Sequence, residues 1–180
     1  MCRETVVNDY LQSMRKAYQE LMPGKVGRCM ISEENWIDRG AMACGEEAGV
    51  RVKAGDICWM DYGQAYLNEM GYQHFGLVVT IIMHKALVVP LTSSLSAYER
   101  AYDPIENPTG NPCLMRIGLV EGLRKNSTLY LNDMKFVNTA RMFEVRAHLS
   151  EEDPLFTEIK DRVTQMLVRA SVIQASGRNQ

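Results

Sequence analysis

Three segments, GDICWMDYG (55–63), HFGLVVTII (74–82) and ALVVPLTSS (86–94), decide the fold of this chain. The second and third segments are apolar, have the length of β-strands and are rich in β-branched residues. Only residues 83–85 separate them. The pattern therefore predicts an antiparallel hairpin that turns at 83–85 and follows a strand in the first segment.

The predicted hairpin places His74 at the same end of the sheet as Thr92 and Ser93. Imidazole suits proton transfer because its pKa lies near neutrality, and hydroxyl groups can donate hydrogen bonds to an oxyanion. These three residues are therefore candidate catalytic residues. The alternatives are a partly buried histidine that satisfies a backbone carbonyl, and hydroxyls that cap the turn after a strand.

The composition is typical of a soluble globular protein. Of the 180 residues, 46% are hydrophobic and 23% are charged, and the formal net charge is −2. No apolar run approaches the ~18 residues of a membrane span, and the first ten residues lack the apolar region of a signal peptide. We expect no membrane association, a cytoplasmic location, and nucleic-acid contacts only within a cleft.

The cysteines and histidines indicate no metal site. The five cysteines are scattered without CxxC spacing, and the only histidines are His74, His84 and His148. This pattern favours a reducing compartment over a disulfide framework or a zinc site. We expect no metal and no cofactor.

Helical patterns lie at both ends of the chain. Residues 6–22 have apolar positions at spacings of three and four, and we expect that helix to stop at Pro23-Gly24. Residues 33–48 predict a second helix. Asp153 followed by Pro154 marks the start of a third one near the C-terminus.

The region between these helices predicts a mainly β structure. Further short strands are indicated at 114–120, 128–131 and 141–146, without an alternation of strands and helices. We therefore expect an α+β chain, in which an N-terminal helical extension over 1–49 precedes a domain over 50–180. That domain is a small antiparallel barrel or sandwich with a C-terminal helix.

The order and spacing of several motifs resemble the MazF/PemK family of toxin endoribonucleases. The matching segments span roughly the middle half of the chain and are GDICWMDYG (55–63), a loop with Glu69 and Gly71, HFGLVV (74–79), VVPLTSS (88–94) and STLYLNDMKFVNTARM (127–142). The resemblance implies an SH3-like β-barrel with terminal helices, a homodimer and an antitoxin partner. It also implies metal-independent cleavage of single-stranded RNA.

The resemblance implies site residues as well. It supports His74, Thr92 and Ser93 as catalytic, and it implies substrate contacts by Glu69, Gln73, Ser94, Lys135 and Arg141. Many members carry an arginine where this chain has His74, and the extension over 1–49 lies outside the family core.

Two of these candidates have ordinary structural alternatives. Lys135 could be a solvated surface residue. Arg141 could bind a phosphate with two hydrogen bonds, or it could instead pair with Asp133 or Glu144.

Three functions fit the sequence. The first is a ribonuclease of the MazF/PemK type, in which the ribose 2′-hydroxyl attacks the neighbouring phosphate and leaves a 2′,3′-cyclic phosphate. The second is a non-catalytic barrel that binds RNA or protein. The third is a toxin whose extension over 1–49 covers and inhibits the site.

Overall fold

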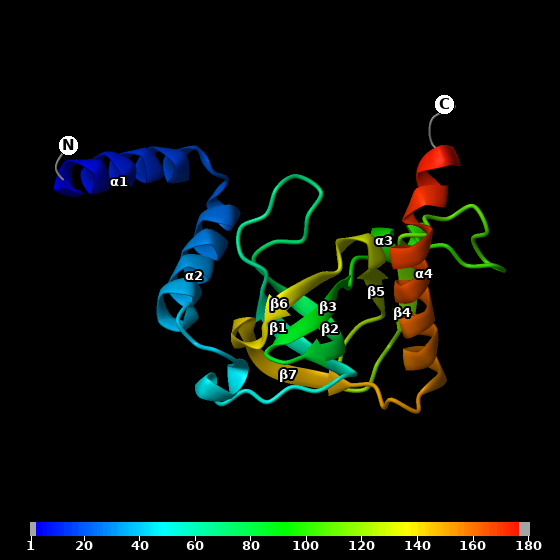
Figure 1. Cartoon of the computed structure of the whole chain (residues 1–180). Coiled ribbons are helices and arrows are strands. Elements are labelled where there is room, and N and C mark those ends of the chain that lie inside the picture. The colour runs from blue at the N-terminus through cyan, green and yellow to red at the C-terminus, as the bar shows by residue number, and fades with distance from the viewer. Residues whose placement is uncertain (1–2, 177–180) are drawn as a thin grey trace.

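Seven strands and four α-helices make up the described part of the chain, residues 3–176, in this computed structural model (Figure 1). Residues 177–180 of the predicted second domain lie outside that range. The helices are α1 (Arg3–Glu20), α2 (Pro23–Arg39), α3 (Leu95–Arg100) and α4 (Pro154–Ser176). The strands are β1 (Asp56–Asp61), β2 (Gln73–Ile82), β3 (Lys85–Thr92), β4 (Leu114–Gly118), β5 (Ser127–Tyr130), β6 (Lys135–Asn138) and β7 (Met142–His148). Short 3-10 turns are η1 (Gly45–Ala48), η2 (Leu131–Asp133) and η3 (Thr139–Arg141).

All seven strands belong to one antiparallel sheet. Its order is β4-β5-β3-β2-β1-β7, and β6 pairs with β3 beside this path. The mainly β fold with flanking helices is thereby confirmed. Within residues 3–176 the ladder does not join the outer strands β4 and β7, so the expected barrel takes the form of an open sheet.

The predicted hairpin is present. β2 pairs with β3 from Phe75 opposite Leu91 to Ile82 opposite Lys85. The chain reverses at Met83 and His84, and Met83 adopts a left-handed backbone conformation with φ 56°. The turn expected at 83–85 therefore lies where the sequence indicated it.

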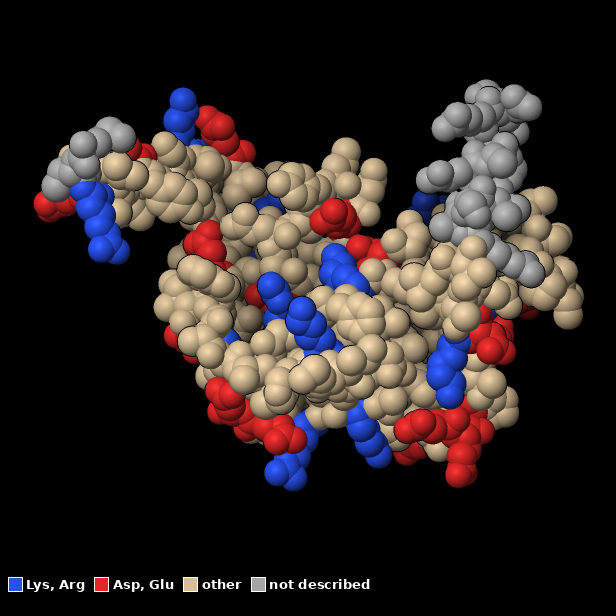
Figure 2. Space-filling view, in the orientation of Figure 1, with Lys and Arg blue, Asp and Glu red and all other residues tan. Residues whose placement is uncertain are grey.

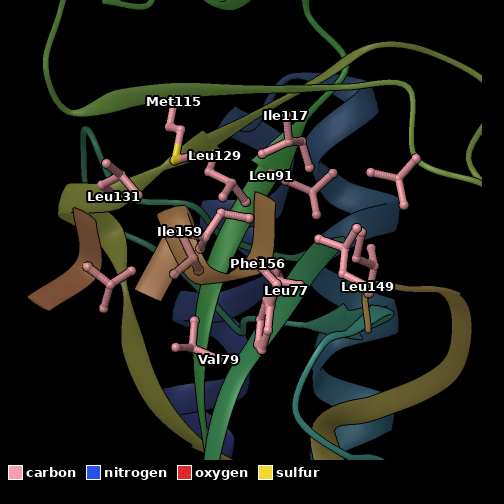
Figure 3. Packing of buried hydrophobic residues seen from close by; sticks show 14 of the residues in the cluster. Leu77, Val79, Leu91, Met115, Ile117, Leu129, Leu131, Leu149, Phe156 and Ile159 are labelled. Atoms are coloured by element: carbon pink, nitrogen blue, oxygen red, sulfur yellow. The ribbon is translucent and has the colours of Figure 1, made fainter. Parts of the chain in front are cut away.

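One face of the sheet forms the main hydrophobic core with α4 (Figure 3). Leu77 and Leu129 of the sheet and Phe156 and Ile159 of α4 are fully buried there. Side chains alternate between the two faces of a strand, so the neighbouring residues form a second cluster on the other face. Its main members are Met60, Val78, Val88, Val137 and Met142.

The second helix predicted over 33–48 is wrong in its position. α2 begins at Pro23 and ends at Arg39. Proline fits the first turn of a helix because it lacks only a backbone N–H that has no helical partner there, so Pro23 starts α2 as well as ending α1. At Gly45 a Cβ would lie 2.8 Å from the carbonyl oxygens of Thr139 and Val50, and this close packing belongs to the short turn η1.

α1 extends away from the sheet and contributes no buried residue (Figure 1). Its apolar side chains Val7, Tyr10 and Leu11 are about half exposed. Figure 2 shows lysines and arginines interspersed with carboxylates over the visible face, in keeping with the small net charge. Among the described helices, none combines the length and the apolar character of a membrane span.

Candidate active site

His74 and Thr92 lie side by side at the open end of the β2–β3 hairpin. Phe75 pairs with Leu91, and the next residues outward on the two strands are His74 and Thr92, on strands ~4.8 Å apart. The expectation that the hairpin brings these two residues to one end of the sheet is confirmed. On its other side Thr92 pairs with Thr128 of β5.

Thr128 is a polar residue that no sequence pattern singles out. It is fully buried, and its hydroxyl has no hydrogen-bond partner among the described residues. It extends the row of His74 and Thr92 across a third strand. The row therefore consists of an imidazole followed by two hydroxyl-bearing side chains.

The imidazole of His74 is half-buried, and its Nδ1 lies 2.7 Å from the carbonyl oxygen of Gly71. A carbonyl oxygen only accepts hydrogen bonds, so Nδ1 carries the proton and Nε2 keeps its lone pair. Burial lowers the pKa of His74 below its ordinary 6.5. The Gly71 contact opposes this shift, and the positive charge of Arg28 adds to it. The alternative role of His74, to satisfy a backbone carbonyl, is thus present at Nδ1. Nε2 remains available to accept a proton near pH 7.

Gly71, which binds His74, belongs to the loop 63–72. Asp133 and Lys135, which follow β5, hydrogen-bond to the backbone of that loop. The Asp133 carboxylate accepts a hydrogen bond from the backbone N–H of Met70. Lys135 donates to the Met70 carbonyl at 3.5 Å and lies 3.3 Å from Asp133. Lys135, predicted to contact substrate, therefore also positions the loop that binds His74.

Tyr62 packs against β2 next to His74, at Phe75 and Gly76. Its hydroxyl donates to the carbonyl of Phe75 at 3.3 Å and lies where a Cβ on Gly76 would come within 2.2 Å. Burial raises the pKa of Tyr62 well above its ordinary value, so the phenol is neutral. Position 76 must be glycine for Tyr62 to occupy this place.

Gln73 does not face open solvent but binds a buried carboxylate. Its side-chain amide donates to Asp61 at 3.1 Å, and Asp61 is only 1% exposed. Ser32 and Asn35 of α2 donate to the same carboxylate at 2.9 and 3.2 Å, as does the backbone N–H of Gly63 at 3.1 Å. In this structure Gln73, predicted to contact substrate, joins α2 to the sheet.

α2 brings a cation to the site that sequence reasoning missed. The Gln73 amide donates to the Arg28 carbonyl at 3.4 Å, and the Cys29 thiol donates to the Tyr72 hydroxyl at 3.2 Å. These contacts hold Arg28 close enough to His74 to lower the pKa of the imidazole. Arg28 is exposed and forms no ion pair within the described range 3–176.

Ser93 and Ser94 have different surroundings from Thr92. The Thr92 hydroxyl accepts a hydrogen bond from the Ser94 N–H at 3.2 Å, so this pair forms a local turn. Ser93 follows the end of β3 and lines a separate cavity together with Phe75 and Leu91. The structure therefore does not bring Ser93 together with His74.

Glu69 lies on the loop 63–72, and Arg141 lies in the turn η3 beside Asp61. Glu69 is exposed on the loop and accepts a hydrogen bond from the Tyr66 N–H at 3.4 Å. Arg141 donates to the Asp61 carbonyl at 3.3 Å and lines a cavity of about 640 Å³ between α1, α2 and the sheet. No hydrogen bond joins Arg141 to His74 within residues 3–176.

No group of three potential metal ligands occurs among the described residues. His148 lies on β7 with its Nδ1 2.8 Å from the buried carboxylate of Asp56. That pair ties β7 to β1.

The chain is similar to several solved structures, whereas no protein-family model and no curated protein sequence matches it. MazF from Deinococcus radiodurans shares 15% identity at a TM-score of 0.48, over 66% of this chain and 98% of that one. An endoribonuclease from a mycobacterial species, in complex with its cognate antitoxin, shares 10% identity at a TM-score of 0.45, over 66% and 95%. The toxin MazF-mt6 of Mycobacterium tuberculosis shares 12% identity at 0.40, over 61% and 96%.

Proposed function

We propose that this protein is an endoribonuclease that cleaves single-stranded RNA without a metal ion, with His74 as general base. The observation that carries the proposal is the state of the imidazole beside Thr92. The Gly71 carbonyl fixes the proton on Nδ1, and burial lowers the pKa, so Nε2 is free to accept a proton at neutral pH.

The reaction follows from this geometry. Nε2 of His74 removes the proton of a ribose 2′-hydroxyl, whose oxygen attacks the adjacent phosphorus. The bond to the 5′-oxygen breaks, and that oxygen takes a proton from water. The products are a 2′,3′-cyclic phosphate and a 5′-hydroxyl end.

Charge on the phosphate has two sources of stabilisation. The Thr92 hydroxyl stands next to His74 and can donate to a phosphate oxygen. Arg28 lies on α2, where its backbone carbonyl accepts from Gln73, the residue before His74, and it forms no ion pair within residues 3–176. Its planar donors match phosphate oxygens. Arg28 would thus supply the positive charge that many MazF/PemK members carry in the residue at position 74.

The test is cleavage of a long mixed-sequence RNA in the presence of chelator, with the fragment ends mapped. His74→Ala should lower the rate by about 10²–10⁴-fold, the usual worth of a general base. The matched control is His84→Ala, because His84 is exposed in the hairpin turn and contributes only its carbonyl, which accepts from Thr139. Equal rates for the two variants would exclude His74 from catalysis.

His74→Arg separates proton transfer from charge. Arginine cannot act as a base near pH 7 because its pKa exceeds 12. The proposal expects His74→Arg to be as inactive as His74→Ala. An active arginine variant would show that position 74 acts through its charge.

A homodimer and an antitoxin partner are part of the same proposal. The exposed apolar side chains of α1 and α2, among them Tyr10, Leu11, Trp36 and Ile37, support contacts with another protein. Sedimentation at micromolar concentration tests the homodimer. A monomer there would count against it.

The alternative is a non-catalytic RNA- or protein-binding barrel. It is favoured by the same apolar surface together with the absence of arginine at position 74. RNA that is bound by the purified protein but stays intact would support this alternative and exclude the first function.

A further inference from the structure

A second cavity, of about 390 Å³, opens at the end of the β2–β3 hairpin on the face opposite His74. Three apolar side chains, Phe75, Leu91 and Leu123, line it. Leu91 is buried in the main core, and Phe75 packs edge-on against Trp59 at 5.0 Å between ring centroids. This cavity, here called the Arg124 pocket, therefore has a rigid apolar wall with an aromatic ring.

Basic and hydroxyl side chains make up most of the remaining lining. Arg124 and Lys125 are exposed on the loop between β4 and β5, and Arg146 comes from β7. Ser93 and Ser127 add two hydroxyl groups. Arg146 is paired with Glu144 at 2.6 Å, and no carboxylate is among the lining residues.

These features match the parts of a nucleotide. A cavity of this size suits a small ligand. The face of a nucleobase stacks on aromatic rings, a phosphate pairs with arginine and lysine, and a ribose hydroxyl bonds to serine.

The Arg124 pocket also adjoins the catalytic residues along the chain. Phe75 follows His74 on β2, and Ser93 follows Thr92, the last residue of β3. Consecutive Cα atoms are ~3.8 Å apart, so the pocket and the candidate catalytic residues lie at the same end of the hairpin. Ser93 therefore lines this pocket and does not lie beside His74.

We propose that the Arg124 pocket binds a nucleotide that flanks the cleaved bond of single-stranded RNA. The base lies against Phe75, and the phosphate is held by Arg124 and Lys125. This inference rests on the proposed function, because it takes RNA as the ligand.

The experiment measures binding without cleavage. A short RNA with 2′-O-methyl groups at every ribose lacks the nucleophile, so fluorescence anisotropy reports affinity alone. The double variant Arg124→Gln/Lys125→Gln should weaken binding at least tenfold. It should also reduce the slope of log affinity against log salt by about 0.7, the contribution of one neutralised phosphate of a single strand.

The matched control is Arg15→Gln/Lys16→Gln. These residues are also consecutive, basic and exposed, but they lie on α1, which extends away from the sheet (Figure 1). The control removes the same charge and should leave the affinity and the salt slope unchanged. Phe75→Leu should weaken binding while leaving the salt slope as in the wild type, because it removes only the aromatic face.

The outcomes distinguish failure of the pocket from failure of the catalytic function. If the wild-type protein binds the RNA but cleaves no unmodified RNA, the catalytic function is overturned. The affinities of the pocket variants then still decide whether the pocket binds RNA. Equal affinity of the wild type and the Arg124/Lys125 variant overturns the pocket. The same holds if the α1 control loses as much affinity, because the effect is then general charge. A wild type that binds no RNA overturns both.

Discussion

The Ser32 hydroxyl of α2 lies 2.9 Å from a carboxylate oxygen of Asp61, the residue that ends β1. Because Asp61 is buried, its carboxylate needs hydrogen-bond donors to replace water, and α2 supplies two of them. The helix next to α1 is therefore part of the structural framework of the site. It reaches His74 through Gln73, which donates to the same carboxylate.

Ser32→Ala should destabilise the protein. The substitution removes a hydrogen bond to a buried carboxylate, a loss worth about 1.5–3 kcal/mol. Urea unfolding followed by circular dichroism measures it. Ser13→Ala is the control, because Ser13 is exposed on α1 and bonds only to the Asp9 carbonyl. A Ser32→Ala midpoint equal to that of the wild type would mean that Asp61 is satisfied without α2.

The two N-terminal helices should differ when deleted. Removal of residues 1–21 takes away α1, which contributes no buried residue, and should leave the melting temperature within a few degrees of the wild type. Removal of 1–49 also removes Ser32 and Asn35 and leaves the Asp61 carboxylate without two donors. That protein should be unfolded or strongly destabilised in thermal melts.

The second deletion also tests self-inhibition. If the protein without 1–49 is folded and cleaves RNA faster than the full chain, the extension is an inhibitory cover and not a support of the site.

Gly76→Ala should destabilise the protein by displacing Tyr62. Its Cβ would lie 2.2 Å from the Tyr62 hydroxyl, so the ring must move. Overpacking of this kind costs about 1–3 kcal/mol. Tyr62→Phe in the same chain removes the clashing oxygen and should recover part of the stability in urea unfolding. Gly27→Ala, with no atom within 4 Å of its Cβ, should instead stabilise α2 by about 0.5–1 kcal/mol.

Arg28→Gln should move the pH profile of cleavage. A base acts when unprotonated, so the rate falls as pH drops through the pKa of His74, which lies below 6.5. The positive charge of Arg28 disfavours the imidazolium, and its removal raises that pKa. The acid limb of the profile should therefore shift to higher pH, and the His74 resonances should titrate higher by NMR. An NMR titration equal to that of the wild type would place Arg28 too far from His74.

Thr92→Val should lower the cleavage rate by about 10²–10³-fold, the effect of losing one donor to a developing negative charge. Thr92→Ser keeps the hydroxyl and should retain most of the activity. Single-turnover kinetics separates this effect from binding. Equal rates for the valine and serine variants would restrict Thr92 to the local turn with Ser94.

The sequence determined the hairpin and the meeting of His74 with Thr92. Two apolar runs joined by a three-residue turn leave little choice of register, since a slip by one residue would turn every buried side chain outward. Thr92 ends β3, and Ser93 after it lines the cavity on the other face, so their adjacency in the sequence does not place both hydroxyls beside His74.

Only the tertiary structure decided how the N-terminal helices and the later loops meet that hairpin. Ser32 donates to Asp61, Gln73 donates to the Arg28 carbonyl, and Arg124 shares a cavity with Phe75, although each pair is separated by 29 to 49 positions in the sequence. No local period relates such residues. The contacts of α2 arise because the buried Asp61 carboxylate needs hydrogen-bond donors. The contact of Arg124 with the cavity arises because the loop after β4 packs over the end of the core. Local patterns therefore place His74 beside Thr92, and long-range packing supplies the charges around them.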